Sequence, residues 1–235
     1  MIKKKNSHHS GNAIFFILIG VVMFAALIFT MTRGMNTSNK LTTEEEANLA
    51  ATEVLSYGNT IRTVVEQLLL LKGASDINTG GNGILFSAPS ASIDYGTFGD
   101  QPSTEIFNTL GGKVIYQIPA ASICSISCKY EFTGQYTITG VGGDTKAELA
   151  LVVAGMDSNV CKRTNSMLGH KWSYIPTGSE LTLTRFDGLN YSDNGGANPI
   201  TLTGGSNEFV AQRAFCYQES TGGRRNILVY VIKPR

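Results

Sequence analysis

Residues 11–31 read GNAIFFILIGVVMFAALIFTM, and the 19 residues from Ala13 to Met31 contain no charged side chain. As an α-helix this run would be about 28 Å long, close to the thickness of the hydrocarbon core of a bilayer. The run therefore predicts a transmembrane helix over residues 13–31, which follows a short leader over residues 1–12. The rest of the chain would lie on one side of the membrane.

Basic residues flank the apolar run unequally. Lys3, Lys4 and Lys5 precede it, whereas only Arg33 and Lys40 follow it closely. Because the cytoplasmic flanks of membrane helices carry the excess of Lys and Arg, we expect a cytoplasmic leader and an exported body. A cleaved signal peptide is the alternative interpretation. Such peptides, however, have an apolar core of only about 7–15 residues, followed by a small-residue cleavage site that is missing here.

The composition limits the partners and the chemistry of the chain. It carries 19 basic and 18 acidic residues, a net charge of +1, which excludes the basic surface of a nucleic-acid-binding protein. Charged residues make up 16%, and the 26 glycines suit a loop-rich β body. The histidines, His8, His9 and His170, belong to no catalytic or metal-binding motif. We therefore expect no enzyme activity and no cofactor.

Beyond the apolar run the sequence divides into three parts. Residues 32–41 predict a polar break, residues 42–73 an amphipathic helix and residues 74–235 an exported β-rich head. Thr42 and Glu45 have the spacing of a capping box, which favours a helix start there.

The predicted helix over residues 42–73 is too polar to span a membrane. Gly73 is its expected stop, and Gly58 inside it should weaken it by about 1 kcal/mol relative to alanine. Its apolar face is expected to pack on the sheet of the head.

The head combines short strands with one further helix. Residues 156–168 predict that helix, which Gly169 would end. The candidate strands are residues 84–86, 113–117, 130–139, 149–153, 181–186 and 227–232. The fold class is therefore α+β, with a mostly antiparallel sheet.

Four cysteines lie in the exported part, where an even number favours disulfides. Cys161 falls on the predicted short helix and Cys216 just before the last hairpin, two elements expected to pack together. Cys124 and Cys128 are close in sequence without the spacing of a redox or zinc motif. We therefore predict the pairs Cys161–Cys216 and Cys124–Cys128.

The order of these segments resembles that of type IV pilins and the pseudopilins of type II secretion. In those proteins a basic leader ends in glycine, and an apolar helix runs into an amphipathic one that packs on a β-sheet. The opening Gly11-Asn12-Ala13-Ile14-Phe15 is similar, more narrowly, to a largely uncharacterised pilin-like set of alphaproteobacteria. The shorter stretches that share this likeness are residues 111–117, 132–142, 160–169, 215–216 and 228–230.

The resemblance implies a processing site and an assembly surface. A prepilin peptidase would cut after Gly11, leaving Asn12 as the new N-terminus. The fifth mature residue, which is Glu in most pilins, is Phe16 here. Minor pseudopilins of the tip type also lack this Glu. Packing against other subunits would then use Phe16, Val22 and the small residues Gly20, Ala25 and Ala26.

The function that follows is a non-enzymatic structural subunit, a minor pilin or pseudopilin of a pilus or secretion filament. It would sit in a bacterial inner membrane with its head in the periplasm, and its partners would be further pilin-like subunits. The alternative is a static single-pass periplasmic protein whose β head binds a ligand or partner. An exported enzyme is a third possibility, for which the sequence offers no catalytic motif.

Overall fold

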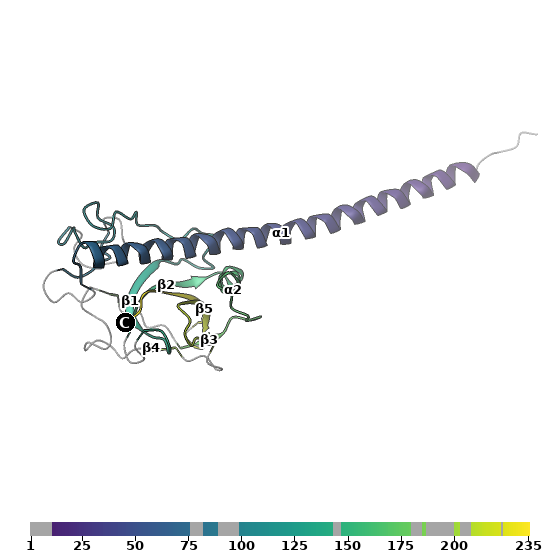
Figure 1. Ribbon diagram of the computed structural model, residues 1–235. Coiled ribbons are helices and arrows are strands. Elements are labelled where there is room, and N and C mark those ends of the chain that lie inside the picture. Colours follow the sequence, from purple (N-terminus) through teal and green to yellow (C-terminus); the bar gives the residue numbers. More distant parts are fainter. Residues whose placement is uncertain are drawn as a thin grey trace, which may run out of the picture. The chain divides into compact units, whose positions relative to one another are not determined.

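The computed structural model in Figure 1 contains a long helix and a β-rich body. It describes the main chain of residues 11–75, 82–88, 99–142, 147–179, 185–186, 200–202, 208–221 and 223–235. Side chains are described over the same ranges except at 11–16, 25–42 and 200–201. The chain forms two compact units, Met1–Glu45 and Glu46–Arg235.

Helix α1 (Gly11–Leu71) is 61 residues long and belongs to both units. It is helical throughout residues 32–41, so the predicted polar break is wrong, and Thr42 does not begin a new helix. The interval contains no proline, and its polar residues and Gly34 each lower helix stability by about 1 kcal/mol or less. Polarity alone therefore does not end the helix.

The C-terminus of α1 is where the sequence predicts it. Gly73 has φ +64°, the left-handed conformation that glycine adopts without strain. The amides of Lys72 and Ala74 both donate to the Leu68 carbonyl, at 3.1 and 3.2 Å. These bonds close the last turn, so the glycine stop is confirmed.

The body contains a six-stranded sheet in the order β3-β5-β6-β2-β1-β4. The four central strands pair antiparallel, while the two short outer strands, β3 and β4, pair parallel. The α+β class with a mostly antiparallel sheet is thus confirmed. The strands are β1 (Tyr130–Thr137), β2 (Glu148–Met156), β3 (Thr177–Gly178), β4 (Ile200–Thr201), β5 (Ala214–Glu219) and β6 (Asn226–Lys233).

Strand prediction succeeded for β1, β2 and β6 and missed β3, β4 and β5. Within residues 84–86 only Leu85 forms a bridge, an isolated one to Glu105, and residues 113–117 belong to no strand. Of the candidate at 181–186, residues 181–184 lie outside the described residues. The segment 113–117 has strand composition without a strand partner.

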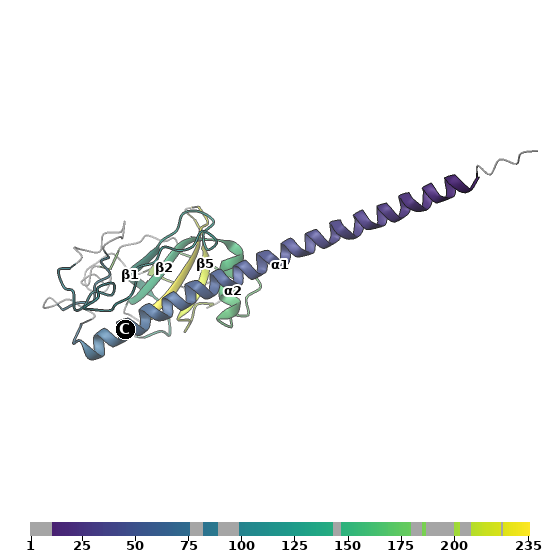
Figure 2. The same cartoon turned by 90° about the horizontal axis from the view of Figure 1, so that it is seen from above.

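Apolar side chains cover both faces of the sheet. On one face lies α1 (Figure 2), which contributes Ala51, Val54, Ile61 and Val65 to a cluster with alternate residues of the strands. The opposite face carries a second cluster, which includes Phe209 from the chain before β5. The sheet is therefore the middle layer of the body.

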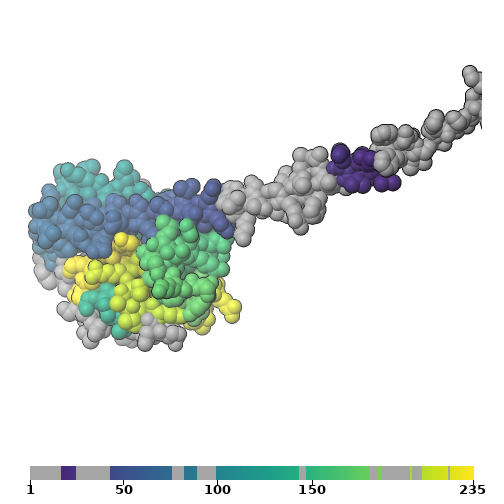
Figure 3. All heavy atoms as spheres, turned by 45° about the vertical axis from the view of Figure 1, so that its right-hand side comes forward, coloured from purple at the N-terminus to yellow at the C-terminus, as the bar shows by residue number. Residues whose placement is uncertain are grey.

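Helix α2 (Ser158–Met167) lies beside α1 over the same face of the sheet (Figures 2 and 3). Asp157 caps its N-terminus by accepting from the amides of Asn159 and Val160 at 2.8 and 3.4 Å. Gly169, with φ +82°, follows its C-terminus. The predicted short helix is confirmed, but it begins at Ser158 and not at Met156, which is the last residue of β2.

Candidate functional site

Two surface features of the described residues are candidates for a functional site, because they expose apolar or unpaired groups. One is the stretch Ile17–Phe24 of α1, in which every residue is exposed. Its seven large apolar side chains are between 39% and 69% exposed, and Figure 3 shows the stretch in purple. Eight consecutive residues make more than two turns, so they point to all sides of the helix. A helix that is apolar all round is normally covered by other protein or by lipid.

The predicted assembly residues are only partly within this stretch. Val22 is 59% exposed, and a Cβ built on Gly20 would meet no described atom within 4 Å. The side chains of Phe16, Ala25 and Ala26 lie outside the described residues.

The predicted processing site is at the start of α1. Gly11 is the first residue of the helix and Asn12 the second, and neither side chain is described. Among the described residues, no helix combines the length and the hydropathy needed to cross a membrane. The transmembrane helix over residues 13–31 and the cleavage after Gly11 stay predictions.

Both predicted cysteine pairs occur in the structure. Cys161 of α2 is bonded to Cys216 of β5, with 5.4 Å between their Cα atoms. Cys124 and Cys128 form the local bridge, with 5.7 Å between their Cα atoms. The longer bridge joins a helix to the sheet, and the shorter one holds the loop that leads into β1.

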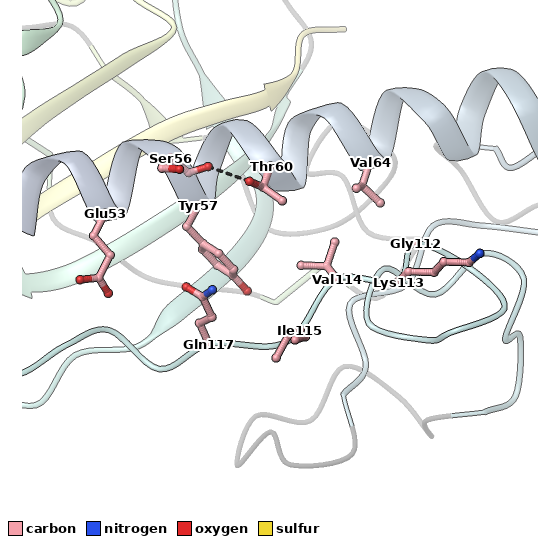
Figure 4. Close-up of a pocket in the computed structure, with 10 residues that line it drawn as sticks. All are labelled: Glu53, Ser56, Tyr57, Thr60, Val64, Gly112, Lys113, Val114, Ile115 and Gln117. Carbon is pink, nitrogen blue, oxygen red and sulfur yellow. Dashed lines mark hydrogen bonds between the residues drawn. The ribbon is translucent and has the colours of Figure 1, made fainter.

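The second outward-facing feature is a cleft of about 500 Å³ between α1 and residues 112–117 (Figure 4). One wall is the α1 face that carries Glu53, Ser56, Thr60 and Val64, and the other consists of residues 112–115 and Gln117. Tyr57 points from α1 across the cleft toward Gln117. Clefts of about 300–1,000 Å³ commonly hold ligands.

Gly112 lets residues 112–117 approach the helix closely, and Gly111 lets the chain pack against the main chain of Pro102 and Glu105. A Cβ on Gly112 would lie 2.6 Å from Cγ1 of Val64 and 2.4 Å from the Ile106 carbonyl oxygen. A Cβ on Gly111 would lie 2.2 Å from the Glu105 carbonyl oxygen. Neither space admits a side chain, so only glycine fits at these two positions.

Tyr57 lies at the bottom of the cleft, and it is the one polar lining residue that is buried. Its hydroxyl finds no hydrogen-bond partner among the described residues and lies beside the main chain of Gln117. Burial raises the pKa of Tyr57 well above its usual value, so the phenol is neutral and able to donate.

The sequence alone did not predict this cleft. Tyr57, Glu53 and Gln117 belong to no motif, and Gln117 is far from the other two along the chain. The only local signal was the strand-like composition of residues 113–117. Among the described residues, no group of three or more His, Cys, Asp or Glu side chains could hold a metal ion.

Comparison with protein-family models, with curated proteins and with solved structures gave no match to this chain.

Proposed function

We propose that this protein is a membrane-anchored, pilin-like structural subunit. The observation that carries the proposal is the stretch Ile17–Phe24, whose large apolar side chains are exposed on every side of α1. Burial of apolar surface is worth about 25 cal/mol per Å², so this surface strongly favours lipid or other helices over water. The uncharged run from Ala13 to Met31, in which the stretch lies, is long enough to cross a bilayer.

A second observation that supports the proposal is that α1 belongs to both compact units. Its residues from Glu46 onward belong to the unit with the sheet, on which they pack, whereas its residues up to Glu45 belong to the other unit. A helix that anchors a β head in this way matches the segment order of pilins and pseudopilins. In the proposed function, the apolar part is stored in the inner membrane and later packs among the helices of neighbouring subunits, while the head faces out.

Cross-linking distinguishes a subunit from a static anchor. A photoreactive residue placed at Val22 should cross-link the protein to a second copy or to another small membrane subunit. The same residue at Lys162, which is exposed on α2, is the matched control and should not. A Val22 adduct to lipid alone, with a monomer as the only protein band, would favour the static single-pass alternative.

Replacement of residues 13–31 by an unrelated apolar span separates insertion from assembly. Insertion needs only length and hydropathy and should survive, whereas assembly needs this particular surface and should be lost. The mass of the N-terminal peptide from membranes tests processing: cleavage after Gly11 leaves Asn12 first. Retained Val22 cross-linking in the replaced protein would count against the proposal.

A further inference from the structure

A second pocket of the body, of about 250 Å³, has basic walls. It is lined by residues of α1, of the chain that follows α2, and of β5 and β6 with the two residues before β5, and it shares no lining residue with the cleft beside Tyr57. Arg62, His170 and Arg213 are among its lining residues, and none of the described lining residues is acidic. A pocket with walls of this kind attracts an anion.

Arg62 is held in place by two neighbours. Its Nε donates to Oε1 of Glu66, one turn further along α1, at 3.0 Å. The Tyr230 hydroxyl, on β6, also lies beside it. A guanidinium has five N–H groups, and the bond to Glu66 uses one of them. Arg62 therefore combines a restrained position with remaining donor capacity for a ligand.

The imidazole of His170 is also fixed. Its Nε2 donates to the Ala214 carbonyl at 2.8 Å, since a carbonyl oxygen only accepts, and the ring stacks on Trp172 with 4.3 Å between the centroids. Among the described residues, Nδ1 has no hydrogen-bond partner. In a charged ring Nδ1 is a second donor, and a nearby anion favours the charged form.

Arg213 brings a further charge from the residue before β5. Its carbonyl accepts from the Val231 amide at 2.7 Å, so its main chain is fixed at the pocket, while its side chain is exposed. Glu148 feels the charge of Arg213 but takes its hydrogen bond from the Arg235 amide. No ion pair within 4.0 Å joins Arg213 to another residue that the structure describes. Its charge is thus not neutralised by direct contact.

We propose that this pocket binds a phosphate group, with Arg62 and Arg213 as its main charged donors and His170 as a third. A phosphate monoester carries nearly two negative charges at pH 7 and three strong acceptor oxygens, which suits three basic groups better than a single carboxylate does. The volume lies just below the usual range of about 300–1,000 Å³ for ligand pockets, so the phosphate and a small attached group fit.

A soluble phosphomonoester and the headgroup of phosphatidic acid share this chemistry. The site uses residues of the body alone, so the inference goes beyond the proposed function and stands independently of it.

Isothermal titration calorimetry of the full chain in detergent micelles with glycerol 3-phosphate measures the binding. We expect a Kd of about 1 mM or lower, because two arginines of the site are present before the ligand arrives. Acetate at the same concentration should not displace the ligand. A Kd above about 10 mM, or displacement by equimolar acetate, would overturn the proposal.

Substitution of Arg213 tests the site against the overall charge of the protein. Arg213→Gln should weaken binding by about tenfold or more, and Arg213→Lys by less, because lysine keeps the charge and loses the forked geometry. The matched control is Arg163→Gln, which removes an equal charge from an exposed position of α2 outside the pocket, and it should change binding by less than about twofold. Equal losses in Arg213→Gln and Arg163→Gln would overturn the proposal.

Substitution of Glu66 tests the role of Arg62 by a gain in affinity. Glu66→Gln removes the carboxylate that competes for the guanidinium, so binding should strengthen by about two- to threefold. Unchanged or weaker binding in this variant would show that Arg62 does not hold the ligand. Phosphatidic acid added to the micelles separates the two sources of phosphate: competition with glycerol 3-phosphate assigns the site to a lipid headgroup, and an unchanged titration assigns it to a soluble phosphomonoester.

Discussion

The side-chain amide of Asn165 makes two hydrogen bonds to the main chain of Cys216. Its Nδ2 donates to the Cys216 carbonyl at 2.8 Å, and its Oδ1 accepts from the Cys216 amide at 2.7 Å. The same strand residue is bonded to Cys161 on the previous turn of α2. Asn165 thus replaces a neighbouring strand at this point of β5, and the disulfide holds it there.

Loss of the Asn165 amide should destabilise the body strongly. Asn165→Ala leaves a buried amide and a buried carbonyl without partners, and we expect a loss of about 2–4 kcal/mol in the free energy of unfolding. Ser166→Ala, at the exposed neighbouring position, is the control and should change stability by less than about 0.5 kcal/mol. Denaturant titration, followed by the fluorescence of Trp172, measures both. Equal effects of the two changes would contradict this account.

The two disulfides should contribute unequally. The Cys161–Cys216 bridge spans 55 residues and should stabilise by about 4 kcal/mol in the chain-entropy model. The Cys124–Cys128 bridge spans only 4 positions and should stabilise by about 2 kcal/mol. Paired cysteine-to-alanine variants, unfolded under the same conditions, provide the comparison. A larger loss from the short bridge would reverse the expected order.

Glu148 should make the protein less stable as the pH rises. Burial raises the pKa of the Glu148 carboxyl from 4.5 to about 7, although its Oε2 accepts from the Arg235 amide at 2.8 Å. A raised folded-state pKa adds stability that is complete below pH 4.5 and is lost as the pH rises through about 7. The change should be at most about 3 kcal/mol.

Glu148→Gln tests this pH dependence, since glutamine keeps the shape and cannot ionise. Unfolding titrations between pH 4.5 and 8 should show a falling stability for the parent protein and a flatter profile for the variant. If the stability of the parent protein and of the variant fell equally with pH, another group would be the cause of the pH dependence.

Gly58 and Tyr230 should be energetically coupled. A Cβ on Gly58 would lie 3.0 Å from Cγ of the Tyr230 ring, so the glycine lets α1 lie against that ring. Gly58→Ala should destabilise by about 1–2 kcal/mol through crowding. In a Tyr230→Ala background the same change should instead stabilise by up to about 1 kcal/mol, because alanine is the better helix former. A destabilisation of equal size in both backgrounds would show that the ring is not the cause.

Local patterns predicted much of the fold. The capping residue Asp157, the stop at Gly169 and the β-branched runs of β1, β2 and β6 act on neighbours within a few positions, and these elements are where the sequence placed them. The break over 32–41 failed because polarity without proline does not end a helix. β5, whose residues are AFCYQE, was missed because it lacks the β-branched run that marks a strand.

The cleft could not be predicted in the same way. Residues 113–117 have strand composition, yet a strand exists only when a partner edge is adjacent, and composition contains no information about the partner. Gln117 and Tyr57 both line the cleft, and Gly112 brings the chain close to Val64 of α1. The packing that places α1 there involves the whole body.

The sequence by itself determined the uncharged run from Ala13 to Met31, the end of α2 before Gly169 and the even number of cysteines, since each depends on residue type and short-range spacing. Only the tertiary structure decided that Asn165 completes β5 at Cys216, that Glu148 is buried beside the Arg235 amide and that residues 113–117 belong to no strand. Asn165 and Cys216 are 51 positions apart and Glu148 and Arg235 are 87 apart. Contacts between residues so far apart in the sequence form only when the core packs, so no local pattern specifies them.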